Sequence, residues 1–72
     1  MKMARATNLW RTVRFSLDGQ RFERRLVHQV GDLAELNAGS PVGRALVTGR
    51  PGDEVVVKAP GGDVVVKVLE VL

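Results

Sequence analysis

The side chains of this 72-residue chain that could do chemistry are few, and none stands in a pattern that a reaction needs. His28 is the only histidine, and cysteine is absent. A catalytic histidine needs an oriented nucleophile or carboxylate, and a transition-metal site needs several nitrogen or sulfur ligands. The glycine-rich stretches at 49–52 and 61–62 lack the spacing and the Lys-Ser/Thr end of a phosphate-binding loop. We therefore expect no enzymatic activity, no cofactor and no metal.

Basic and aromatic side chains are mixed in the first part of the chain. Residues 1–30 hold seven Lys and Arg against two Asp and Glu, a balance of +5, whereas residues 31–72 have a balance of −2. Single-strand nucleic-acid binders combine a positive groove with stacking aromatic side chains. Trp10, Arg11, Arg24 and Arg25 are therefore a candidate nucleic-acid contact. The alternative is that these arginines only keep a strand face in solvent.

A β-hairpin must position these residues. Apolar Val13, Phe15 and Leu17 alternate with polar residues, which is typical of a strand with one buried face. Asp18-Gly19 then favours a two-residue type I′ turn, because both central residues need positive φ. This turn places Phe22 opposite Phe15, and Glu23 opposite Arg14. It also places Arg24 on the core side opposite Val13, a conflict that a bulge in the second strand or a register shift could resolve.

The middle of the chain predicts a short helix. The second strand is expected to end near Val30, and residues 33–38 read as a connector with one helical turn. Ser40-Pro41 then starts a helix, since serine caps the first turn and proline fits its first position. The helix is expected over residues 41–48, with Gly49 as a left-handed C-cap.

Two valine-rich strands complete the expected fold, over residues 54–59 and 63–71. Their consecutive valines indicate a strand covered on both faces or one at an oligomer contact. The whole pattern predicts an α+β domain, an antiparallel sheet curled over one short helix. Residues 1–8 are expected to form a flexible arm, and residues 9–72 a single domain.

The run SPVGRALVTGRPGDEV, residues 40–55, resembles the signature of the C-terminal domain of the GreA/GreB transcription elongation factors. That signature reads Ser-Pro-(Leu/Ile/Met)-(Gly/Ala)-Arg-Ala-Leu, a loop, and Gly-Asp-x-Val. Residues 59–63 are similar to the family's Pro-Gly-Gly-Glu turn, and residues 68–71 to its closing strand. The resemblance implies an FKBP-like fold that docks on RNA polymerase near the secondary channel. It implies a docking surface of Ser40, Pro41, Arg44 and Arg50.

The chain also departs from the family pattern. Only about eight residues precede the first strand, so we expect the family's coiled coil, and with it stimulation of transcript cleavage, to be absent. Gly39 stands where the family often has an acidic residue that is thought to help grip the polymerase. The link between the second strand and the helix is short, which predicts a bare sheet edge and a homodimer through it.

Three interpretations stay open at this point. The chain is a polymerase-docking domain, a small basic nucleic-acid-binding domain, or a truncated dimeric remnant of a Gre factor. No apolar run reaches the ~20 residues that span a bilayer. The N-terminus lacks the apolar core of a secretory signal. We therefore expect a cytoplasmic protein that does not contact membranes.

Overall fold

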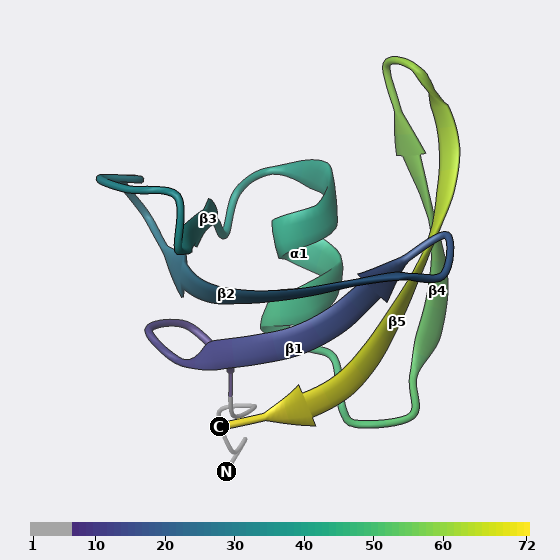
Figure 1. The fold of residues 1–72 in the computed structure, drawn as a ribbon. Helices are drawn as coiled ribbons and strands as arrows, with labels where there is room; N and C mark the ends of the chain where they lie inside the picture. The colour runs from purple at the N-terminus through teal and green to yellow at the C-terminus, as the bar shows by residue number, and fades with distance from the viewer. Residues whose placement is uncertain (1–6) are drawn as a thin grey trace, which may run out of the picture.

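The computed structural model describes residues 7–72, which form one five-stranded sheet and one helix. Residues 1–6 of the predicted N-terminal arm, which was expected over residues 1–8, lie outside the described residues. The strands are β1 (Thr12–Leu17), β2 (Gln20–Val27), β3 (Glu35–Asn37), β4 (Glu54–Ala59) and β5 (Gly62–Val71), and the helix is α1 (Pro41–Val47). The sheet order is β3-β2-β1-β5-β4, and the sheet curls around α1 (Figure 1). The predicted fold class is confirmed.

The β1–β2 hairpin has the predicted register. Phe15 lies opposite Phe22, and their rings stack with centroids 5.8 Å apart. Asp18 and Gly19 both have positive φ, 47° and 88°, as a type I′ turn requires. The turn is also joined to β5, because the backbone N–H of Val65 donates to the Asp18 carboxylate over 2.8 Å.

Neither a bulge in the second strand nor a register shift resolves the conflict at Arg24. Pairing between β1 and β2 runs without a shift, and Arg24 stays on the side of Phe22. Its guanidinium lies 5.4 Å from the centre of the Phe22 ring, so the stem covers apolar surface while the charge reaches solvent. The irregularity lies instead between β1 and β5, where Arg14 faces Glu70 and Phe15 faces Val68. Leu69 is therefore the extra residue of a β-bulge.

The predicted connector at residues 33–38 contains a strand and no helical turn. β3 pairs with the end of β2 in parallel, so the sheet is mixed rather than wholly antiparallel. Backbone hydrogen bonds from Arg25 to Ala34 and from Ala38 to Val27 flank this pairing. β2 also ends at Val27 rather than near Val30. β3 thus covers the expected bare edge of β2 only along Arg25–Val27.

Helix α1 begins as predicted but ends differently. Its C-cap is Thr48, and Gly49 does not have a positive φ. Gly49 is buried, and a Cβ there would lie 2.7 Å from a Val68 methyl group. Close packing on β5, rather than a left-handed conformation, is therefore the reason that glycine is needed at this position.

The core lies between α1 and the concave face of the sheet. Leu46 is the fully buried anchor of the helix, and Val13 and Leu26 are fully buried on β1 and β2. The β4–β5 hairpin extends away from the rest of the sheet (Figure 1). Its consecutive valines are not covered on both faces by the part of the chain that the structure describes, since Val56 is 61% exposed.

Candidate partner-binding site

The start of α1 is held by hydrogen bonds that the sequence largely predicts. The Ser40 hydroxyl accepts from the backbone N–H of Gly43 over 3.0 Å, as an N-cap does. It also donates to the Asn37 carbonyl over 2.7 Å, which ties the cap to β3. Pro41 occupies the first helical position and is exposed. The Ser40 hydroxyl thus already has two hydrogen-bond partners within the fold, whereas Pro41 is exposed to solvent.

Arg44 lies three residues after Pro41, so both project from neighbouring positions on one side of the helix. Arg44 is exposed and forms no ion pair with any of residues 7–72. Arg50 is exposed beyond the other end of α1, where its backbone N–H donates to the Asp53 carboxylate over 2.9 Å. The structure therefore brings together Ser40, Pro41 and Arg44, whereas Arg50 lies in the loop that follows α1.

The end of α1 is held by Asn8, a residue that the sequence placed in the N-terminal arm. Its side-chain amide donates to the carbonyls of Leu46 and Gly49 over 2.7 and 2.8 Å. Its backbone N–H donates to the Val47 carbonyl over 2.7 Å. Asn8 therefore satisfies carbonyls that a helix end leaves without partners.

The candidate nucleic-acid residues are divided between two sides of the sheet. Trp10 is 53% exposed with a φ of 69°, and its carbonyl accepts from the Arg25 guanidinium over 3.1 Å. The Arg11 guanidinium donates to the Leu72 carbonyl over 2.9 Å. Arg24, adjacent to Arg25 on β2, points to the opposite side, as alternation along a strand requires. Nucleic-acid contact by these residues stays a prediction.

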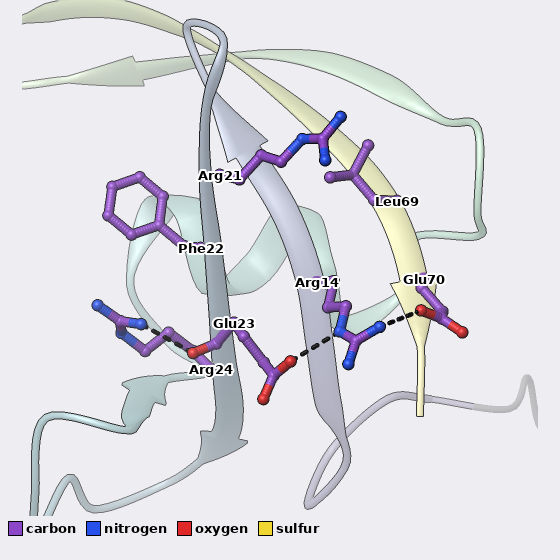
Figure 2. A pocket seen from close by; sticks show the side chains of 7 residues that line it. All are labelled: Arg14, Arg21, Phe22, Glu23, Arg24, Leu69 and Glu70. Carbon is purple, nitrogen blue, oxygen red and sulfur yellow. Dashed lines mark hydrogen bonds and ion pairs between the residues drawn. The ribbon is translucent and has the colours of Figure 1, made fainter.

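An open groove of about 840 Å³ lies along β2, β1 and the bulged part of β5. Figure 2 shows the chain of ion pairs that crosses it, from Glu23 through Arg14 to Glu70. Arg14 contacts Glu23 at 2.7 Å and Glu70 at 2.8 Å. The Arg14–Glu23 pair follows from the hairpin register, but Glu70 depends on the bulge at Leu69, for which the sequence carries no local signal.

These ion pairs raise the pKa of Arg14 above its ordinary value. The main cause is the hydrogen bond with Glu23 together with its negative charge, and Glu70 adds to the effect. A raised pKa of a basic group stabilises the folded protein below the ordinary pKa, and this contribution is lost only as the pH rises through the raised value. Arginine therefore stays charged at any practical pH. The groove therefore contains a solvent-exposed ion-pair network in which Arg14 stays charged, and it is not a site of proton transfer.

The described residues contain neither a metal-ligand cluster nor a membrane-spanning helix. Within residues 7–72, no group of three or more His, Cys, Asp or Glu residues is placed to hold a metal ion. The single helix of this region has seven residues, which is too short to cross a bilayer.

Comparison with protein families identifies the chain. Residues 11–72 match the family described as transcription elongation factor GreA/GreB, C-terminal. The chain belongs to this family. The match includes all five strands and the helix, so the GreA/GreB C-terminal domain accounts for the whole described fold. Comparison with curated protein sequences gives no match.

Solved structures of Gre-type factors share the fold. A GreA/GreB elongation factor from Nitrosomonas europaea is 27% identical with a TM-score of 0.65, covering 97% of this chain and 64% of its own. The GreA factor homolog Gfh1 of Thermus thermophilus is 25% identical with a TM-score of 0.66, covering 89% of this chain and 46% of its own. Gfh1 of Thermus aquaticus, 24% identical, has a TM-score of 0.69. The chain thus spans about half to two thirds of the length of these proteins.

Proposed function

We propose that this GreA/GreB C-terminal domain binds RNA polymerase near the secondary channel, through the surface formed by Ser40, Pro41 and Arg44. Membership of a transcription elongation factor family supports the partner. The observation that carries the surface is Arg44, which is exposed and has no acidic partner among residues 7–72. A helix cap needs no arginine at this position, so the Arg44 side chain is free to meet a carboxylate of a partner.

Arg50 belongs to the proposal as a second contact in the loop that follows α1. The loop that carries it is held in place, because the Gly52 N–H donates to the Val68 carbonyl over 2.8 Å. A partner that contacts both Arg44 and Arg50 would have to reach from the last turn of α1 to the loop that follows the helix.

The proposed activity of this chain is docking without stimulation of transcript cleavage. In the family that the sequence resembles, cleavage depends on acidic residues at the tip of a coiled coil. The single helix within residues 7–72 is the seven-residue α1, which lies on the sheet. A domain that docks in this way can occupy a polymerase surface that other factors use. A polymerase partner also places the protein in the cytoplasm.

Retention by immobilised core RNA polymerase tests this proposal. The wild-type chain is expected to be retained at about 50 mM salt, and Arg44→Glu to lower the affinity about tenfold or more, as loss of a charged interface contact does. Arg21→Glu is the matched control, because it makes the same charge change at an exposed arginine on β2. Absence of retention, or equal retention of Arg44→Glu and wild type, would show that the proposal is wrong.

A further inference from the structure

Strand β4 is a free edge of the sheet, and its backbone is ready to pair with another strand. β5 is its only neighbour among the described strands. The Val68 N–H donates to the Asp53 carbonyl over 2.9 Å, so residue 53 directs its carbonyl toward β5. Because backbone groups alternate in direction along an antiparallel pair, Val55 and Val57 then bond to β5. The N–H and C=O groups of Glu54, Val56 and Lys58 consequently point away from the sheet.

The side chains of β4 do not protect this edge. Free edges are usually blocked by a proline, a bulge or a centrally placed charge. β4 instead has three consecutive valines at its centre, and it pairs with β5 without a register shift. Val56 is 61% exposed on the outer face, and Val55 is 42% exposed on the face that α1 covers elsewhere. Both faces of the edge therefore offer apolar surface.

We propose that β4 pairs in antiparallel orientation with β4 of a second copy of this chain, about a two-fold axis at Val56. In this register Val56 faces Val56 of the partner subunit, and Glu54 faces Lys58 of the partner subunit. Every outward backbone group of the three residues finds a partner, which gives roughly six hydrogen bonds. A shift by two residues in either direction would break the pair of Glu54 and Lys58 and would place one of these two charged residues opposite Val56.

The charges of the hairpin favour this register. Within one chain, Glu54 lies opposite Lys67, and Lys58 lies opposite Asp63. Self-pairing extends each of these pairs into a row across four strands, in which Lys67, Glu54, Lys58 of the partner subunit and Asp63 of the partner subunit alternate in sign. Between the two charged rows lies an apolar row, because Val56 is opposite Val65 within each chain. Opposite charges and apolar side chains facing each other stabilise a sheet.

A second copy fits this edge better than an unrelated strand. The sequence Glu-Val-Val-Val-Lys is complementary to itself when reversed, and an edge that receives a different protein has no need of that symmetry. The inference does not rest on polymerase docking, because none of the proposed docking residues belongs to β4. The variants that test the two proposals share no residue, so either proposal can fail alone.

Sedimentation of the whole chain at concentrations from roughly 1 µM to 1 mM, the range of weak association, tests the pairing. The wild-type chain is expected to shift from monomer to dimer as its concentration rises. Glu54→Lys and Lys58→Glu should each weaken self-association about tenfold or more, because each places like charges opposite one another twice per dimer. An equimolar mixture of the two variants should dimerise again, since every facing pair then has opposite signs.

Asp63→Lys is the matched control for effects within one hairpin. It places a like charge opposite Lys58 on β5 but leaves the β4 edge unchanged. Its self-association should stay within about threefold of the wild-type value. Circular dichroism of each variant shows whether the sheet is retained. A wild-type chain that stays monomeric throughout, or a mixture of folded variants that does not dimerise, would overturn the proposal.

Discussion

Gly43 of α1 packs against the last residue of β3 and the residue after it. A Cβ at this position would overlap the carbonyl oxygen of Asn37 and would lie 2.9 Å from the Ala38 Cα. Both atoms belong to the backbone, so no side-chain rotation can make room. The resembling family signature allows glycine or alanine here, but in this chain the space allows only glycine.

Gly43→Ala is therefore expected to destabilise the domain by about 2–3 kcal/mol, even though alanine favours a helix over glycine by ~1 kcal/mol. The free energy of unfolding in urea measures the effect. Gly61→Ala is the control, because Gly61 has open space around it and no positive φ. It should change stability by less than about 1 kcal/mol. Equal stability of the two variants would contradict the packing argument.

Helix α1 is an element that depends on distant residues at both ends. Seven residues are too few for a helix that is stable alone. Ser40 supplies the N-cap and joins it to Asn37, whereas the C-terminal carbonyls are capped by Asn8, which is 38 residues from Leu46 in the chain. The first cap follows from local sequence. The second could not be predicted, because nothing near residue 8 indicates which carbonyls it meets.

Asn8→Ala is expected to cost about 1–2 kcal/mol, because it leaves two carbonyls without their donor. Asn8→Asp keeps the shape of the side chain, replaces the donor by an acceptor and adds a negative charge at the helix C-terminus. It should therefore be the less stable variant of the two at neutral pH. Urea unfolding measures both, and an Asn8→Asp protein as stable as wild type would contradict the capping role.

The sheet shows which pairings a sequence can reveal. The β1–β2 hairpin was predictable because the Asp18-Gly19 turn fixes the register between neighbouring residues. β3 was not, because it has only three residues, of which Glu35 and Leu36 favour a helix, and because it pairs with β2 in parallel. The register between β1 and β5 joins residues 49 to 58 positions apart, from Leu17–Val66 to Val13–Val71, and contains a bulge. That register brings Glu70 to Arg14, so the Arg14–Glu70 ion pair of the groove could not be predicted from local sequence.

At the scale of the whole molecule, stability depends on the contact between α1 and the sheet. Leu46 is fully buried, so Leu46→Ala should cost about 2–5 kcal/mol. That is a large part of the stability of a domain this small. We therefore expect Leu46→Ala to have a markedly lower melting temperature than wild type in thermal denaturation. Leu33→Ala makes the same chemical change at a side chain that is 91% exposed, and it should stay within about 0.5 kcal/mol of wild type. Similar melting temperatures of Leu46→Ala and Leu33→Ala would contradict this account.

The pairing of β1 with β5 also decides how this domain can be combined with others. Leu72 donates its N–H to the Thr12 carbonyl and accepts from the Arg11 guanidinium, so residues 11 and 72 lie side by side. The Pro60-Gly61 turn is at the opposite end of the molecule (Figure 1). The first and last residues of the domain are therefore adjacent at one end of the fold. The domain can be grafted into a surface turn of another protein without separating the two halves of its host.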